Sequence, residues 1–263
     1  MFRADLHTHT TFSDGTCDPK ELILLAKEKG LDGLAITDHD NVDAFFEVKT
    51  FAKDKLPLLC GIELSCEHVS KSVHVLGYGF DPDIMRDFCV HFLELRMQRN
   101  EKICRNLQNA GFKISLDALK GSYKKALGRP QIANYLVETK QISSFQQAFV
   151  QYIGNHASCY VEGYRLSIQE AIEKIHLANG KALIAHPHLL KDPILFKELI
   201  AMPFDGIEAY YASFTKSQCL PFLEVANQKQ WIVTGGSDFH GNIKSNMLGS
   251  SFTNEETFSE LYV

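Results

Sequence analysis

Near its start the chain contains the stretch Ala4-Asp5-Leu6-His7-Thr8-His9, and we expect a strand over residues 2–9. The next signal, Asp18-Pro19-Lys20-Glu21, provides an N-cap, a proline for the first helical turn and a capping-box glutamate. These residues predict a helix that ends at Gly30. The chain therefore begins as strand, loop and helix, with two histidines where the strand ends.

The same order recurs along most of the chain. Further strands are expected over residues 31–37, 56–63, 72–80, 181–185, 204–209 and 231–235. Helices are expected over roughly 42–54, from the Ser167 cap to Gly180, near 193–201, and up to about Gln230. Alternating strands and helices favour an α/β fold of parallel strands with helices packed outside. A length of 263 residues suffices for one α/β barrel or for two small domains.

A middle region interrupts this alternation. It is mostly helical, with a long helix up to Ala110, a break at Gly111 and further helices on either side of Gln141. We interpret residues 83–163 as a mostly helical inserted subdomain that covers the active site. Residues 1–82 and 164–263 would then form the barrel domain.

Composition argues against several classes of protein. A formal net charge of -5 disfavours a protein that coats duplex nucleic acid through a basic surface, but leaves open a small anionic substrate. Seven cysteines with no Cys-x-x-Cys pair argue against a disulfide framework and a thiolate zinc site, so reduced, mostly buried thiols are expected. Without a long apolar run or a signal-peptide pattern, we expect a cytoplasmic protein with no membrane partner.

Histidines and carboxylates gather where the expected strands end. They occupy residues 5–9 with Asp14, 37–40, 61–63, 74, 185–188 and 237–241. Residues two apart on a strand point to the same face, so Asp5, His7 and His9 share one side and two imidazoles can meet one ion. Asp238 and His240 repeat this spacing, and in a parallel barrel both pairs would open onto the C-terminal face.

Nine side chains form the candidate metal site. They are His7, His9, Asp14, His39, Glu63, His74, His186, Asp238 and His240. Imidazole and carboxylate ligands without thiolate suit Mn, Fe or Zn in a catalytic role better than structural zinc. A single histidine near a strand end is usually packed or solvated, so the prediction of two or three divalent ions depends on the joint placement of the group.

The sequence resembles the polymerase and histidinol phosphatase (PHP) family over essentially its whole length. The matching segments are Asp5-Leu6-His7-Thr8-His9, Thr37-Asp38-His39, Ala185-His186-Pro187 and Ser237-Asp238-Phe239-His240-Gly241, with Gly61-Ile62-Glu63 as the bridging carboxylate segment. The resemblance implies a distorted seven-stranded (βα) barrel with a trinuclear site. It places one ion on His7, His9, Glu63 and Asp238, a second on Glu63, His74 and His186, and a third on Asp14, His39 and His240.

Arg99 is a candidate for binding an anion. On a helical wheel it lies near the middle of an apolar stripe roughly 120° wide, formed by Phe88, Phe92, Leu95, Ile103 and Leu107. Such an arginine can extend outward or pair with an acidic neighbour. We favour the alternative that the helix faces the barrel mouth and that Arg99 binds a phosphate in a bidentate manner.

A second cation comes from Gly128-Arg129-Pro130. Pro130 is suited to open a helix, where Arg129 would lie beside the free N–H groups, although a plain turn would also explain the segment. In the PHP subgroup with a helical insertion, an arginine on the long helix and an Arg-Pro pair contact the substrate phosphate. The resemblance therefore implies substrate binding by Arg99, Arg129 and Pro130, with Asn100 a weaker candidate.

Clustered divalent ions and arginines fit the hydrolysis of a phosphate ester by an activated water. In that reaction Arg99 and Arg129 would stabilise charge, while His188 could protonate the leaving group or lie at the surface. The resemblance implies a small phosphorylated substrate: the 3'-phosphate of a nucleoside 3',5'-bisphosphate, or short RNA processed from its 5' end.

Two alternatives stay open, a histidinol-phosphate phosphatase and a non-catalytic metal-binding or polymerase-associated PHP module. The insertion with its arginines argues against the first alternative. The complete set of ligands argues against the second.

Overall fold

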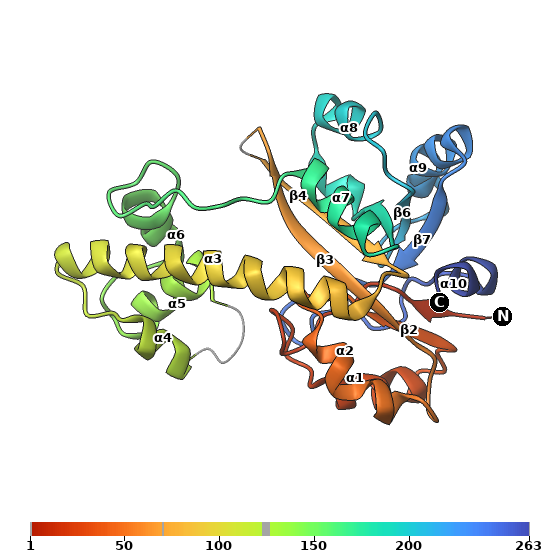
Figure 1. Ribbon diagram of the computed structural model, residues 1–263, viewed down its shortest axis with the longest axis horizontal. Helices are drawn as coiled ribbons and strands as arrows, with labels where there is room; N and C mark the ends of the chain where they lie inside the picture. The colour runs from red at the N-terminus through yellow and green to blue at the C-terminus, as the bar shows by residue number, and fades with distance from the viewer. Residues whose placement is uncertain (1, 70, 123–126, 263) are drawn as a thin grey trace. The chain divides into compact units, whose positions relative to one another are not determined.

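Seven strands of the described residues form one sheet and pair in chain order (Figure 1). The computed structural model describes residues 2–69, 71–122 and 127–262. The strands are β1 (Ala4–Asp5), β2 (Gly33–Ile36), β3 (Leu58–His68), β4 (Lys71–Tyr78), β5 (Lys181–Ile184), β6 (Gly206–Tyr211) and β7 (Ile232–Gly236). The two edges of the sheet also meet. Thr8, which follows β1, and Phe239, which follows β7, form a parallel bridge. The sheet is thus a nearly closed seven-stranded α/β barrel, and the expected fold class is confirmed.

Strand β4 departs from the expected parallel arrangement. The pairs β1–β2, β2–β3, β5–β6 and β6–β7 are parallel, but β4 runs antiparallel to both β3 and β5. The cause is the short connection from His68 to Lys71, which can return the chain only as a hairpin, whereas a parallel neighbour needs a crossover. The hairpin also extends β3 past its expected end at Glu63, so that Glu63 lies within the strand.

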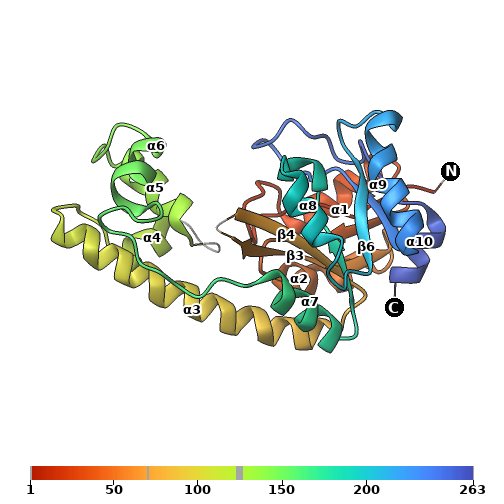
Figure 2. The same ribbon diagram turned by 90° about the horizontal axis from the view of Figure 1, so that it is seen from above.

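Helices follow the strands as the sequence patterns predict. Those of the barrel are α1 (Pro19–Glu28), α2 (Asp43–Ala52), α7 (Ile168–Leu177), α8 (Pro193–Leu199), α9 (Lys216–Lys229) and α10 (Glu255–Leu261), with a 3-10 turn η2 (Pro187–Leu190). Helix α1 begins where expected because the Asp18 carboxylate accepts the Lys20 N–H at 2.9 Å. Helix α7 lies alongside β3 and β4 (Figure 2). Gly77 permits this close packing, since a Cβ there would lie 3.0 Å from the Ile175 side chain.

Apolar burial stabilises the barrel strands and their helices. One buried cluster joins α1 and α2 to β2, and another joins β1–β5 to α10. Within the second cluster the fully buried Tyr78 donates its hydroxyl to the Leu6 carbonyl at 2.6 Å. All seven cysteines are free and all but Cys17 are buried, as expected. Among the described residues, no helix is long and apolar enough to cross a membrane.

The chain divides into two compact units. We call Met1–Cys89 with Arg165–Val263 the barrel unit and Val90–Tyr164 the insertion unit. The long helix α3 (Pro82–Asn109) begins in the barrel unit and ends in the insertion unit, followed by the break expected at Gly111, where φ is +93°. The insertion unit continues with α4 (Leu116–Ser122), α5 (Arg129–Glu138), α6 (Phe145–Gln147) and the π-helical η1 (Ala148–Ile153). It has its own buried apolar cluster, which includes Ile103, Leu107, Leu119, Ile132 and Leu136.

Candidate metal centre

All nine predicted ligands belong to the barrel unit, and the structure brings them together. His7, His9 and Asp14 follow β1, His39 follows β2, Glu63 lies in β3, His74 lies in β4, His186 follows β5, and Asp238 and His240 follow β7. Loops after parallel strands meet at one end of a barrel, which explains why residues distant in sequence share one site.

The first group surrounds one oxygen of Glu63. His9 Nε2 lies 3.0 Å and His7 Nε2 3.2 Å from Glu63 Oε2. Asp238 Oδ1 lies 3.4 Å from His9 Nε2 and 3.5 Å from His7 Nε2. Ligands that bind one ion at about 2.1 Å in a tetrahedral or octahedral arrangement are separated by about 3.0–3.4 Å. These four side chains therefore have nearly the spacing of ligands around a single cation.

The second oxygen of Glu63 faces a different pair of imidazoles. His74 Nδ1 lies 2.7 Å and His186 Nε2 2.8 Å from Glu63 Oε1. His39 Nδ1 lies 3.4 Å from Oε2, so it approaches the same carboxylate from the side of the first group. Glu63 thus stands between two sets of imidazoles, as a bridging carboxylate would.

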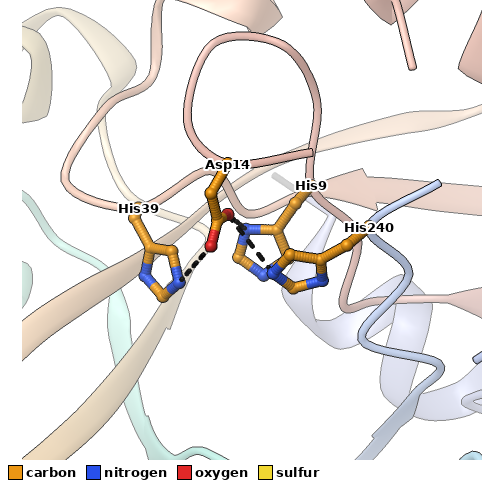
Figure 3. A group of neighbouring side chains, drawn as sticks. All are labelled: His9, Asp14, His39 and His240. Atoms are coloured by element: carbon orange, nitrogen blue, oxygen red, sulfur yellow. Dashed lines mark ion pairs between the residues drawn. The ribbon is translucent and has the colours of Figure 1, made fainter. Parts of the chain in front are cut away.

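A third group forms around Asp14 (Figure 3). Asp14 Oδ1 lies 3.2 Å from His240 Nε2 and 3.6 Å from His9 Nδ1, and Asp14 Oδ2 lies 3.8 Å from His39 Nε2. The carboxylate of Asp14 is 44% exposed, whereas that of Glu63 is 1% exposed. The third group is therefore the loosest and the most open to solvent.

Four buried atoms of the cluster form no hydrogen bond within the described part of the chain. They are His9 Nε2, His39 Nδ1, Asp238 Oδ1 and His240 Nε2. Each faces another predicted ligand atom at 3.0 to 3.4 Å. Buried polar atoms normally have a partner, and a divalent cation among these atoms would supply one. The residues present therefore fit a metal centre with imidazole and carboxylate ligands.

The cluster balances buried carboxylates against imidazoles. Burial alone would raise the pKa of Glu63, but the imidazoles of His39 and His74 hold it well below its ordinary value. Burial alone would lower the pKa of His9, but the carboxylates of Asp238 and Glu63 raise it to about 9. At His39 burial prevails and lowers the pKa to about 4. Without metal, the ionised carboxylates are thus balanced by protons that a bound cation would displace.

Glu208 in β6 supports the cluster and was missed by the sequence reasoning. It is buried, its Oε1 accepts the His7 Nδ1–H at 2.9 Å, and its Oε2 accepts the His186 N–H at 2.8 Å. The first bond directs His7 Nε2 toward the metal centre. The available signal was weak, a lone carboxylate in the apolar strand Gly206-Ile207-Glu208-Ala209, without a motif around it.

Asp5 and Asp38 stabilise the backbone around the site. The expectation that Asp5 shares a face with His7 does not make it a ligand, because its carboxylate accepts the Ser237 N–H at 2.9 Å and the Gly249 N–H at 2.8 Å. It thereby ties the end of β1 to the segment after β7. Asp38 accepts the Thr10 N–H at 2.7 Å and fixes the loop that carries Asp14.

The four predicted phosphate-binding residues lie in the insertion unit. Arg99 is half-buried, and its alkyl chain passes Gly163 so closely that a side chain there would collide with it. Asn100 is fully buried and donates to the Leu127 carbonyl at 2.8 Å. Arg129 begins α5 and donates to Asn155 Oδ1 at 2.9 Å, next to the exposed Pro130. Their contact with a substrate stays a prediction.

His188 lies in η2 among aromatic rings of the barrel unit. Its ring centroid is 4.3 Å from that of Tyr211 and 4.4 Å from that of Phe214. Burial, together with the neighbouring His186, lowers the pKa of His188 to about 4. A neutral imidazole is a poor proton donor near pH 7, so the proposed role as general acid gains no support from this environment.

A nearly closed barrel with clustered imidazoles and carboxylates at its strand ends is the architecture of a metal-dependent hydrolase. The model of the PHP domain family matches residues 5–184, and the chain belongs to this family. The expected family and the expected enzyme class, a phosphoric ester hydrolase, are thereby confirmed.

Several characterised proteins are similar along most of their length. A 5'-3' exoribonuclease of Haemophilus influenzae is 32% identical over 244 residues, which cover 90% of this chain and 89% of that protein. The 5'-3' exoribonuclease Rnm of Escherichia coli is 30% identical, with coverage of 90% and 84%. A 3',5'-nucleoside bisphosphate phosphatase of Chromobacterium violaceum is 28% identical, with coverage of 91% and 88%.

Two solved structures share the fold across nearly the whole chain. One is from Bifidobacterium adolescentis, assigned as a metal-dependent phosphoesterase, with a TM-score of 0.79, 30% identity and coverage of 98% of this chain and 94% of the other. The second is an amidohydrolase of Chromobacterium violaceum with bound sulfate, with a TM-score of 0.78, 27% identity and coverage of 98% and 95%.

Proposed function

We propose that this protein is a nucleotide phosphoesterase that removes the 3'-phosphate of nucleoside 3',5'-bisphosphates and shortens small RNAs from the 5' end. The observation that carries the proposal is Glu63, whose two oxygens face separate groups of imidazoles within 3.2 Å. This arrangement suits a bridged pair of cations, the usual device for displacement at phosphorus. The names of the relatives from Haemophilus influenzae and Chromobacterium violaceum support the substrate class.

The chain would hold two or three divalent ions, Mn, Fe or Zn, on the nine predicted ligands. When bound, such ions lower the pKa of a water and stabilise charge on the phosphoryl oxygens. Glu208 keeps the Nε2 atom of His7 directed toward the first group, and Glu63 holds the two groups at a fixed separation. In this proposal Arg99 and Arg129, with Asn100 and Pro130 beside them, bind the phosphate. No side chain has to act as the nucleophile.

The substrate is a small phosphorylated molecule rather than duplex nucleic acid. This part of the proposal agrees with the net charge of -5, which gives the chain no general attraction to a polyanion. A cytoplasmic location stays a prediction.

A comparison of three substrates tests the proposal. Metal-loaded protein would be assayed on adenosine 3',5'-bisphosphate, on a short 5'-phosphorylated oligoribonucleotide and on histidinol phosphate. We expect kcat/KM to be highest on one of the first two substrates. Preference for histidinol phosphate would replace the proposal with that activity, and full metal content without turnover of any phosphate ester would support a non-catalytic module.

A matched variant shows whether turnover comes from this site. Asp238→Asn removes one charge from the first group and should abolish turnover on every substrate. Asp205→Asn is the control, because Asp205 contacts His176 and Lys181 and none of the predicted ligands. Equal loss in both variants would mean that the activity reflects overall folding rather than the metal centre.

A further inference from the structure

The segment after His240 places a lysine against the metal centre. Lys244 Nζ lies 2.8 Å from Asp238 Oδ2, and the Lys244 side chain is 41% exposed. Lys244 therefore contacts one of the nine predicted ligands directly. It belongs to the barrel unit, as the ligands do.

The two oxygens of Asp238 have different surroundings. Oδ1 faces His7 Nε2 at 3.5 Å and His9 Nε2 at 3.4 Å, on the side where a cation would bind. Oδ2 faces away from these imidazoles and accepts two hydrogen bonds, one from the Tyr211 hydroxyl at 2.8 Å and one from Lys244. A hydrogen-bond donor on the outer oxygen helps to orient a ligating carboxylate.

Tyr211 is well suited to be that orienting donor. Its hydroxyl accepts a hydrogen bond from Asn246 Nδ2 at 2.9 Å, which directs the hydroxyl proton toward Asp238. The Tyr211 ring also packs against His188 and Phe214. Held on both sides, Tyr211 can position Asp238 without assistance from Lys244.

The ammonium group of Lys244 therefore has spare capacity for a ligand. It carries three N–H donors, and its hydrogen bond to Asp238 uses one of them. Its Nζ contacts Oδ2 of the carboxylate whose other oxygen, Oδ1, faces His7 and His9. A tetrahedral phosphate that places one oxygen among the predicted ligands can direct a second oxygen to this ammonium group, as lysines do in other phosphate sites.

We propose that Lys244 binds a phosphoryl oxygen of the substrate beside the metal centre. This inference rests on the proposed function, because its ligand is the phosphate on which that function acts. It gives the barrel unit a phosphate-binding cation of its own, independent of Arg99 and Arg129.

The test measures binding of inorganic phosphate to the metal-loaded protein by calorimetry, in wild type, Lys244→Met and Lys244→Gln. Loss of a charge-assisted hydrogen bond should weaken phosphate binding about 10- to 100-fold. Metal content, measured by elemental analysis, should stay at the wild-type level. Turnover should show a raised KM, and Lys244→Arg should recover part of the binding.

Two further variants separate substrate binding from the positioning of Asp238. Tyr211→Phe removes the second donor to Asp238 Oδ2 and leaves the Lys244 ammonium group in place. It should weaken metal binding and leave the phosphate affinity of each metal-loaded site within about twofold of wild type. Lys197→Met removes an exposed lysine of α8 and should change neither quantity.

The possible outcomes are distinct. If Lys244→Met and Lys244→Gln lose metal, or bind phosphate as well as wild type does, Lys244 is not a phosphate ligand. If fully loaded wild-type protein binds no phosphate, the proposed function itself fails. Phosphate binding by wild type that is weakened in both Lys244 variants, at full metal content, supports the inference.

Discussion

The metal centre of the barrel unit and the arginines of the insertion unit differ in what their side chains contact. In the barrel unit the predicted ligands contact one another, and Glu63 alone lies within 2.8 Å of both His74 and His186. In the insertion unit Arg129 donates to Asn155 and to the Ile153 carbonyl, within its own unit. A bound cation explains why the ligands in the barrel unit lie so close together. The contacts of Arg129 fit a role in packing as well as a role in phosphate binding.

The difference shows where short motifs carry functional information. A ligand at a strand end is positioned by the strand pairing and by hydrogen bonds within the barrel unit, such as those that the Ser237 and Gly249 N–H groups donate to Asp5. An arginine on a helix has a long, flexible side chain, so its target depends on how the helix is placed. Experiments that separate metal content from substrate affinity can therefore test the two regions independently.

Removal of the bridging carboxylate should have the largest effect. Glu63→Ala takes a ligand from both groups of imidazoles, so metal content should fall and kcat/KM should decrease by about 10³-fold or more. Glu67→Ala is the matched control on the same strand, because Glu67 contacts Arg165 instead. Wild-type metal content in Glu63→Ala would show that Glu63 does not bridge.

Metal binding should strengthen as the pH rises. In the metal-free protein the pKa of His9 is raised to about 9 by Asp238 and Glu63. Protonated His9 stabilises the metal-free fold below its unfolded pKa of about 6.5, and this contribution is lost as the pH rises through about 9. A cation needs the neutral imidazole, so its affinity should rise by nearly tenfold per pH unit well below the pKa and level off near it, or about 50-fold from pH 7 to 9.

Competition with a chelator at each pH measures this affinity directly. The difference in melting temperature between loaded and metal-free protein should widen over the same range. An affinity that stays constant between pH 7 and 9 would mean that His9 is already neutral, contrary to its contacts with Asp238 and Glu63.

Loss of the carboxylate behind His7 should have a smaller effect. Glu208→Gln keeps the size of the side chain but removes the charge that directs His7 Nε2 toward Glu63. We expect metal affinity to fall about 10- to 100-fold, as is usual for residues that orient a metal ligand. An unchanged affinity in the same chelator assay would mean that the sheet alone positions His7.

The sequence was sufficient to predict the barrel and the clustering of the nine candidate ligands, but not the residues that support them. Motif spacing and strand order indicate that His7 and Asp238 meet, because parallel strands end on one side of the sheet. The reversed direction of β4 comes from a short turn that strand patterns alone do not specify. Glu208 and Lys244 were missed because each is a single charged residue, and only the folded chain shows the ligands that they contact.

Substitution of Arg99 in the long helix α3 should have the smallest effect among these changes. It should alter the affinity for substrate and leave the metal content unchanged. Arg99→Ala is expected to raise KM by about tenfold, because one charge-assisted contact to phosphate is lost, while metal content stays at the wild-type level. Arg105→Ala is the matched control on the same helix, since Arg105 is exposed and pairs with Glu101. If KM is equal in the two variants, Arg99 is a packing residue beside Gly163, and if metal is lost instead, Arg99 supports the centre itself. A raised KM at full metal content would show that the insertion unit supplies substrate affinity to a centre that the barrel unit builds alone.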